Sequence, residues 1–215
     1  MIKSLLNHRF ALLFASLVFT MTIVPVVRAL GVGPGILDVA LAINLALAMF
    51  AATRRKRNLL LAPAVAAVFL VARFISTAVG GQLLLSASEL GWVVFILLAI
   101  IAALRSALGR GPVNAERIFA ALSVYLLAGL LFAVLYWIFE QTWPNSFRTS
   151  TQTLFTLRDA IYFSFVTLTT VGYGDVIAVA DPARSFAVVQ AVGGQLYLAV
   201  LVARLVSLHA REESR

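Results

Sequence analysis

The chain has 215 residues, of which 62% are hydrophobic and only 12% are charged. Ordinary soluble domains are about 45–50% apolar and about 25% charged, so this composition excludes an ordinary soluble domain and indicates a membrane protein. The formal charge of +8 does not indicate nucleic-acid binding, because the basic residues are scattered between apolar segments instead of forming one face. The absence of cysteine excludes disulfides and thiolate metal sites.

Apolar segments follow one another along nearly the whole chain. Crossing a bilayer takes about 20 apolar residues in a helix. Six segments are candidates for membrane spans: Phe10–Val27, Ile36–Ala52, Leu59–Val79, Leu90–Leu108, Ile118–Phe139 and Ala183–Leu208. The first could be mistaken for a signal peptide, but it is longer than the ~7–15 apolar residues usual in such a signal. We therefore expect it to be a retained helix.

The distribution of Lys and Arg predicts the orientation of the spans. With a cytoplasmic N-terminus, twelve basic residues lie on the cytoplasmic side and four lie on the other side. Basic residues are enriched in cytoplasmic loops, so we expect both termini to be cytoplasmic. The cluster of Arg54, Arg55, Lys56 and Arg57 is best explained as part of this topology signal, with binding of anionic lipid as the alternative.

The fourth predicted span lacks a ladder of charges. No charged residue occurs from Leu90 through Leu104, and Arg105 stands near the inner end. A voltage sensor needs several gating charges, because each contributes only ~2.3 kcal/mol per 100 mV. The run Gly109-Arg110-Gly111-Pro112 also disfavours a stiff helical connection to the fifth span. We therefore predict that voltage has little influence on the activity of this protein.

Between the fifth and sixth spans lies an apolar segment that is too short to cross. It runs from Leu157 to Thr169, and Thr156 with Asp159 three residues later predicts a capping box at its start. An irregular, glycine-containing run follows it. Irregular backbone at membrane depth is tolerated only where it is buried in protein or lines a water-filled cavity. The pattern therefore predicts a re-entrant helix and loop that line a pore.

The sequence of this loop resembles the pore loop of tetrameric potassium channels. Residues 161–175 read I-Y-F-S-F-V-T-L-T-T-V-G-Y-G-D, which contains the filter motif of that family at Thr170-Val171-Gly172-Tyr173-Gly174. The resemblance covers roughly the last hundred residues. The first four predicted helices agree only in topology with the bacterial six-helix, voltage-gated-like members, and they lack the charged fourth helix.

The resemblance implies an all-α membrane protein with six transmembrane helices, a re-entrant pore helix and a filter loop. Residues 1–111 would form a four-helix membrane domain like a degenerate voltage sensor, and residues 112–215 would form the pore domain. One subunit supplies one pore loop, so a closed ring requires a homotetramer. We expect no enzymatic activity, no cofactor apart from K⁺, and a location in the plasma membrane, as in the inner membrane of a bacterium.

A dehydrated potassium ion needs a shell of oxygens, which rings of backbone carbonyls supply. Gly172 and Gly174 reach the required backbone angles cheaply because they lack a Cβ. By resemblance, the carbonyls that bind K⁺ belong to Thr170, Val171, Gly172 and Tyr173. The residues expected to support the filter are Tyr162, Phe163, Val166, Thr167 and Asp175.

Two of these supporting residues depart from the family pattern. Phe163 offers no polar group where many relatives have tryptophan, so Thr167 becomes the expected partner of the Tyr173 hydroxyl. Val166 stands where some bacterial relatives carry a glutamate paired with the equivalent of Asp175. We therefore expect no such carboxyl pair in this chain.

The last span carries the residues expected to form the cavity and the gate. The resemblance places a hinge at Gly194, next to Gly193, whereas close helix packing is the alternative reason for small residues there. Gln195, Leu198 and Val202 recur at helical spacing and are expected to line the cavity. Val206 is the candidate for the inner constriction.

Two further interpretations compete with a potassium channel. Phe163 and Val166 could loosen the filter, which would give a poorly selective cation channel that passes sodium. The chain could also be a non-conducting regulatory subunit that assembles with another channel. Reversal potentials in mixed potassium and sodium would distinguish a poorly selective channel from a potassium channel. Ion flux from the purified chain alone would exclude a regulatory subunit.

Overall fold

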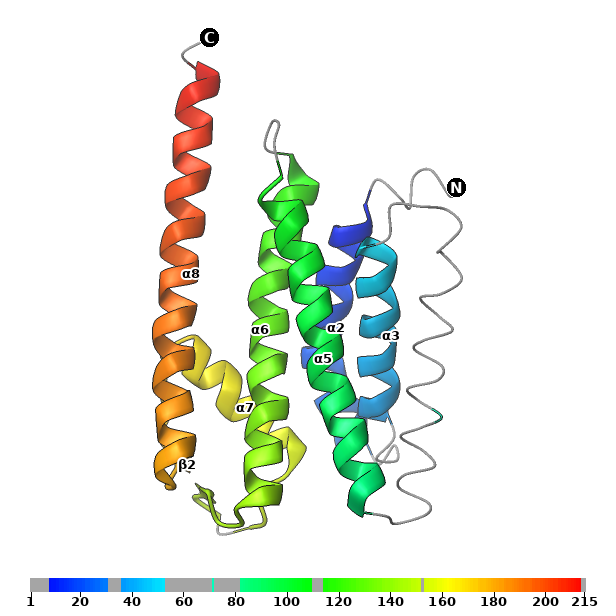
Figure 1. Ribbon diagram of the computed structural model, residues 1–215, viewed down its shortest axis with the longest axis vertical. Coiled ribbons are helices and arrows are strands. Elements are labelled where there is room, and N and C mark those ends of the chain that lie inside the picture. The colour runs from blue at the N-terminus through cyan, green and yellow to red at the C-terminus, as the bar shows by residue number, and fades with distance from the viewer. Residues whose placement is uncertain are drawn as a thin grey trace. The chain divides into compact units, whose positions relative to one another are not determined.

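The computed structural model describes residues 8–30, 36–52, 71, 82–109, 114–151 and 153–213. Its helices are α2 (Arg9–Ala29), α3 (Ile36–Ala52), α5 (Gln82–Ala107), α6 (Ala115–Thr142), α7 (Leu157–Leu168) and α8 (Asp181–Glu213), as Figure 1 shows. Two short strands, β1 (Phe147–Thr149) and β2 (Val176–Ala178), flank α7 in the sequence. The predicted span Leu59–Val79, apart from Val71, and the basic cluster at 54–57 lie outside the described residues.

The described part of the chain contains three helical segments long and apolar enough to cross a bilayer. They are Glu89–Ala107, Ala115–Thr142 and Asp181–Arg204. These segments coincide with the fourth, fifth and sixth predicted spans. The apolar parts of α2 and α3, Arg9–Ile23 and Val39–Ala51, are shorter. The molecule is therefore mostly helical and has the character of a membrane protein, while the total of six spans stays a prediction.

The chain forms two compact units, residues 1–127 and residues 128–215, which we call the N-terminal and C-terminal units. The division falls within α6, later than the boundary predicted at residue 111. In the N-terminal unit, α3 packs against both α2 and α5. Buried Asn44 joins α3 to α2, because its amide accepts a hydrogen bond from Ser16 at 2.5 Å and donates one to Thr20 at 2.7 Å.

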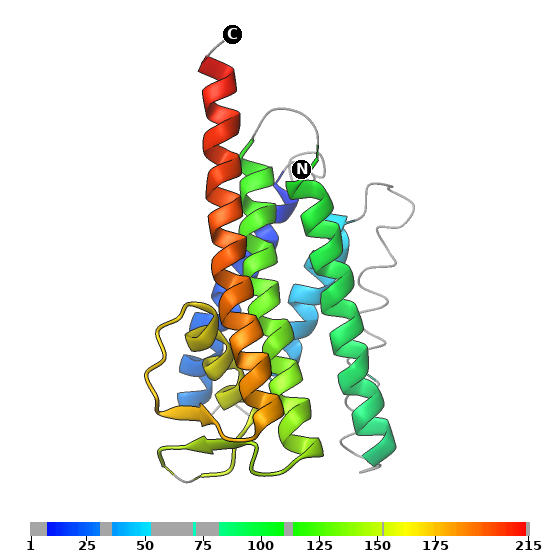
Figure 2. The same ribbon diagram turned by 60° about the vertical axis from the view of Figure 1, so that its left-hand side comes forward.

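The C-terminal unit is built around α7, which packs against α8. In Figure 2, α7 and the loop that follows it lie beside the first half of α8. The aromatic rings of Tyr136, Phe147, Phe155 and Phe163 form the buried core of this unit. Phe163 contacts Tyr136 and Phe147 edge to face, with ring centroids 5.0 and 5.4 Å apart. This cluster fixes the position of α7 from its buried side.

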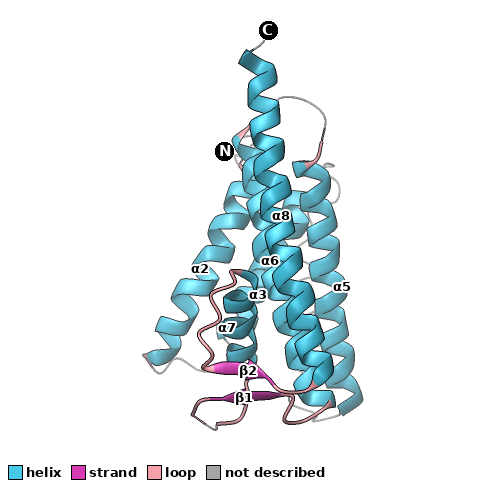
Figure 3. Cartoon of the chain, turned by 90° about the vertical axis from the view of Figure 1, so that its left-hand side faces the viewer, coloured by secondary structure: helices cyan, strands magenta, loops and turns pink. Residues whose placement is uncertain are grey.

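A small antiparallel sheet adds to the predicted all-α fold. Phe147, Arg148 and Thr149 of β1 pair with Ala178, Ile177 and Val176 of β2, and Figure 3 shows the two strands side by side. Residues 147 and 149 are buried and residue 148 is exposed, which is the alternation of a strand with one buried face. The amide of Ser150 extends the pairing by donating to the carbonyl of Asp175 at 2.7 Å.

The capping box predicted at the start of α7 is confirmed. The backbone amide of Thr156 donates to the Asp159 carboxylate at 2.8 Å, and the Asp159 amide donates to the Thr156 hydroxyl at 3.4 Å. These bonds satisfy amides that have no partner within the first helical turn. The helix ends at Leu168, with Thr169 as its C-cap, one residue before the predicted end.

Replacing the capping threonine is expected to weaken α7 measurably. Thr156→Ala removes the hydroxyl that accepts from Asp159 and should lower the free energy of unfolding by about 1 kcal/mol per subunit. Denaturant unfolding of the purified protein measures the change. Thr156→Ser retains the hydroxyl and serves as the matched control. Equal stability of the alanine and serine variants would contradict the capping role.

Candidate functional site

The run Thr170–Gly174, which we call the filter run, follows directly on the C-terminus of α7. The amide of Thr170 donates to the Thr167 carbonyl, and the amide of Val171 donates to the Val166 carbonyl, both at 3.0 Å. These two bonds tie the start of the filter run to the last turn of α7. In Figure 3 the loop then runs back alongside α7 to β2. Entry as a helix and return as a loop agree with the predicted re-entrant geometry.

Every second residue of the filter run has a positive φ angle. The values are +59° at Thr170, +57° at Gly172 and +80° at Gly174. In a regular strand, successive peptide groups point to opposite sides. Alternation between left-handed and ordinary backbone angles can instead turn successive carbonyls toward one side. The sequence predicted this conformation for the two glycines, and the structure extends the alternation to Thr170.

A positive φ at Thr170 is unusual, because it is a β-branched residue and such residues rarely enter the left-handed region. Strained backbone of this kind is concentrated at functional sites. Within the described part of the chain, no hydrogen bond is donated to the carbonyls of Thr170, Val171, Gly172 or Tyr173. Tyr173 is 72% exposed in the single chain and Val171 is also exposed. Among the described residues, the filter run thus has four backbone carbonyls without a hydrogen-bond donor, beside exposed side chains.

Asp175, immediately after the filter run, is anchored to α7. The Tyr162 hydroxyl donates to one carboxylate oxygen of Asp175 at 2.7 Å, and the Val176 amide donates to the other at 3.0 Å. The hydrogen bond to Asp175 raises the pKa of the Tyr162 phenol to about 12. The sequence named both residues as filter support but did not predict this contact.

The other predicted supporting residues lie in different surroundings. Phe163 faces the buried aromatic core, away from exposed Tyr162. Val166 and Thr167 are half-buried on the last turns of α7. Within the described chain, Tyr173 and Thr167 share no hydrogen bond, so their expected pairing stays a prediction. Successive helical residues point about 100° apart, which explains why Tyr162 and Phe163 do not form one aromatic face.

Gly194 of α8 lies against the last residue of α7. A Cβ at position 194 would come within 2.7 Å of Leu168 Cδ1 and 3.0 Å of the Leu168 carbonyl oxygen. A Cβ at Gly193 would meet nothing within 4 Å. The helix is continuous through both glycines. These contacts favour close packing as the reason for glycine at position 194.

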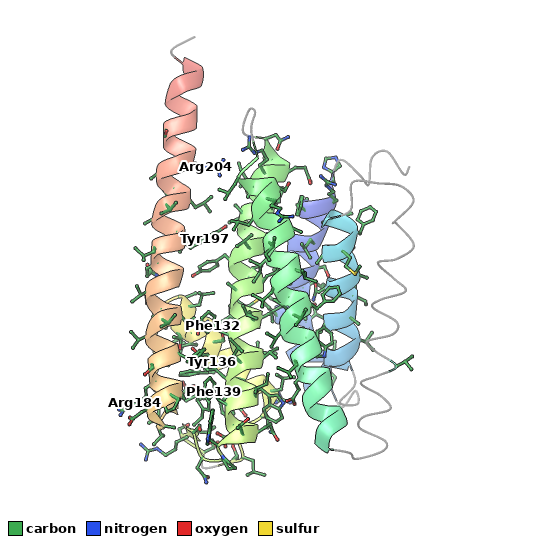
Figure 4. All side chains as sticks on the ribbon, in the orientation of Figure 1. Phe132, Tyr136, Phe139, Arg184, Tyr197 and Arg204 are labelled. Carbon is green, nitrogen blue, oxygen red and sulfur yellow. The ribbon has the colours of Figure 1, made fainter. Side chains whose placement is uncertain are left out.

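The predicted cavity residues begin near the middle of α8 and continue toward its C-terminal end. Gln195 and Val202 are exposed in the single chain, and Leu198 is half-buried. Val206 lies within α8, but its side chain is outside the described part of the structure. In Figure 4, Arg184 marks the end of α8 near the sheet, and Arg204 lies toward the other end. The cavity and the inner constriction stay predictions.

A buried polar contact behind α7 was missed by the sequence reasoning. Gln190 of α8 bonds to Tyr136 of α6 and to Ser164 of α7. The only available signal was a glutamine in an otherwise apolar helix, which usually has a partner. Gln195, five residues later, carries the same signal, and sequence alone does not distinguish the two because it does not give the rotation of α8 about its axis.

Residues 120–210 match the family model described as ion channel. This stretch comprises most of α6, the sheet, α7, the filter run and nearly all of α8. Over this stretch, which is less than half of the chain, the sequence is similar to ion channels. No curated protein and no solved structure matches the chain.

Proposed function

We propose that the chain is one subunit of a potassium-selective channel that conducts K⁺ passively through the carbonyls of the filter run. The observation that carries this proposal is the alternation of positive φ at Thr170, Gly172 and Gly174. Rings of backbone carbonyls replace the hydration shell of K⁺ in filters with this motif. The carbonyls of Thr170, Val171, Gly172 and Tyr173 would hold the ions.

The position of α7 supports the same function. Its C-terminus immediately precedes the filter run, and the C-terminal end of a helix carries about half a negative charge. Placed at membrane depth, that partial charge favours a cation in the water-filled cavity below the filter. Asp175, at the other end of the filter run, adds a carboxylate at the predicted outer mouth.

The exposed residues of the single chain support assembly around an axis. Several apolar side chains of α8 are more than half exposed: Val188, Val189, Val192, Leu196, Val200 and Val202. Together with the exposed filter run, they offer a surface for other copies of the chain. Four copies would close the ring of carbonyls, so we propose a homotetramer in the plasma membrane with cytoplasmic termini. Binding of anionic lipid at residues 54–57 is a further part of this proposal.

The charges of α5 support a weak response to voltage. From Leu90 through Leu104 the helix has no charged residue, and Arg105 lies in its last turn. We propose that the conductance depends little on voltage apart from the driving force. A steep conductance–voltage curve with several apparent gating charges would overturn this part of the proposal.

The poorly selective channel and the regulatory subunit are tested together by ion flux in liposomes. The purified chain, reconstituted without any partner, should release K⁺ from loaded vesicles and should release Na⁺ much more slowly. Equal release of both ions would favour a poorly selective pore. No flux of either ion from correctly folded protein would favour a regulatory subunit.

The contact between Tyr162 and Asp175 yields a separate prediction. Tyr162→Phe removes the hydroxyl that anchors Asp175 and keeps the ring, so the outer end of the filter run should lose one restraint. We expect open bursts in single-channel recordings to shorten by about tenfold or more, because a hydrogen bond to a charged group contributes about 1.5–3 kcal/mol. Ser123→Ala, which removes a buried hydroxyl that bonds, among the described residues, to Phe119 of its own helix, is the control. Unchanged bursts in Tyr162→Phe would contradict the anchoring role.

A further inference from the structure

Three fully buried polar side chains meet on the inner side of α7. They are Tyr136 of α6, Ser164 of α7 and Gln190 of α8, exposed by 0%, 0% and 1%. Figure 4 shows Tyr136 among the side chains that lie between α6 and α8. We call these three residues the polar node. Each of the three helices of the C-terminal unit contributes one member.

The hydrogen bonds of the polar node form a directed circuit. The Tyr136 hydroxyl donates to Gln190 Oε1 at 2.7 Å. Gln190 Nε2 donates to Ser164 Oγ at 2.7 Å and to the Ser164 carbonyl at 3.1 Å. Ser164 Oγ donates in turn to the carbonyl of Gly129 at 2.6 Å. The circuit therefore starts on α6, passes through α8 and α7, and returns to α6.

Both the oxygen and the nitrogen of the Gln190 amide form hydrogen bonds, and these bonds fix the orientation of the amide. Its oxygen faces the Tyr136 hydroxyl and its nitrogen faces the Ser164 carbonyl, so turning the amide over would place two acceptors together at Ser164. Burying a polar group costs free energy unless the group forms hydrogen bonds. Apolar side chains at these positions could pack the three helices together without needing such bonds. The polar node therefore specifies one rotation and one depth of α7 relative to α6 and α8.

The rotation of α7 about its axis determines where the filter run begins, because the filter run is bonded to α7. Ser164 lies on the same helix as Val166 and Thr167, whose carbonyls accept the amides of Val171 and Thr170. On α8, Gln190 lies one helical turn before Gly194, which contacts the end of α7. A change in the position of α8 thus reaches α7 through two neighbouring points. Of these two points, the polar node consists of hydrogen bonds, which fix a direction, whereas Gly194 makes a packing contact.

We propose that Gln190 is a positioning residue which, through Tyr136 and Ser164, holds α7 in the orientation that keeps the filter run conducting. This inference rests on the proposed function. It assigns to Gln190 a part in the stability of the conducting state, with no contact to the permeating ion.

The test uses single-channel recording of the full chain in bilayers. Gln190→Leu removes all bonds of the amide at similar volume, and Tyr136→Phe removes one hydroxyl. We expect the mean open-burst duration to fall about tenfold in Gln190→Leu and severalfold in Tyr136→Phe. Combining the two changes should add little to Gln190→Leu alone, because both break the same circuit. Ser123→Ala, whose buried hydroxyl bonds within α6 in the described part of the chain, should leave the bursts unchanged.

Two readouts separate positioning from a general loss of stability. Raising the K⁺ concentration should lengthen the shortened bursts, because ions bound in the filter favour the conducting state. A variant that merely folds less well would give fewer channels with bursts of normal length. Normal bursts in both node variants, or effects that add fully in the double variant, would overturn the proposal. Should Gln190→Leu fail to assemble, Tyr136→Phe alone decides between these outcomes.

The wild-type reversal potential is measured before any variant is compared. A wild-type channel without K⁺ selectivity, or without current, means that the proposed function fails, and this inference fails with it. A K⁺-selective wild type whose bursts do not depend on the polar node means that this inference alone is wrong.

Discussion

Replacing Gly172 with alanine is expected to abolish potassium current. Gly172 has φ +57°, where an L-residue costs about 1–2 kcal/mol, so four subunits would place about 4–8 kcal/mol against the conducting filter. A Cβ there would meet nothing within 4 Å of its own chain, so the expected effect comes from the backbone angle. We expect K⁺ flux per assembled channel to fall more than about a hundredfold.

D-alanine at the same position is the matched control, because its side chain has the same size and its Cα has the opposite chirality. D-alanine favours positive φ, so a semisynthetic channel with D-alanine at position 172 should conduct K⁺ with nearly normal selectivity. Liposome flux normalised to the amount of tetramer measures both variants. Normal flux through the L-alanine channel, or equal loss in both channels, would contradict the role assigned to the backbone conformation.

Alanine at Gly194 is expected to damage the filter, whereas alanine at Gly193 should be tolerated. At position 194 the added Cβ would come within 2.7 Å of the Leu168 side chain and 3.0 Å of its carbonyl oxygen. Because Leu168 ends α7, two residues before the filter run, the inner helix or the end of α7 must shift. Overpacking of this kind costs about 1–3 kcal/mol per subunit. We expect lower K⁺/Na⁺ selectivity and shorter open bursts.

Gly193→Ala is the control on the same helix, since a Cβ there would have no neighbour within 4 Å. Gly193→Ala removes one glycine of the Gly193–Gly194 pair, and its Cβ would contact no described residue. A Leu168→Ala change in the Gly194→Ala background should restore part of the selectivity, because it removes the closer contact but leaves the carbonyl. Equal effects of Gly193→Ala and Gly194→Ala would indicate that flexibility of the pair matters and that packing does not.

The parts of the fold that follow from local patterns could be predicted from the sequence. Apolar length predicted helices that agree closely with α2, α3 and α6, whereas α5 begins at Gln82, before the predicted start at Leu90. The spacing of Thr156 and Asp159 predicted the start of α7, because a capping box depends only on residues within one turn. The filter run was found from its glycines and their order along the chain.

The contacts that depend on the rotation of helices could not be predicted in the same way. An apolar helix such as α8 has no polar face to orient it, so Gln195 was favoured as the informative glutamine while Gln190 forms the buried contact. The pair of Tyr162 and Asp175 joins residues thirteen positions apart through a loop whose path the sequence did not define. The two strands are only three residues each, too short for a reliable period-two pattern.

The positive φ of Thr170 was missed for a different reason. Sequence reasoning assigns left-handed backbone to glycine, because a β-branched residue is disfavoured there. In the structure, the bonds from Thr170 to Thr167 and from Val171 to Val166 hold the start of the filter run against α7. Tertiary restraint thus overrides the local preference at the residue that begins the alternation.

The reversal potential of the purified channel tests the central claim most directly. With K⁺ on both sides of a bilayer at a tenfold gradient, and Na⁺ replacing K⁺ on the dilute side, a potassium-selective pore should reverse near the potassium equilibrium potential, about 59 mV from zero. We predict that value for the wild type and a shift toward zero in Gly194→Ala. A wild-type reversal near zero under the same gradient would contradict potassium selectivity through the filter run.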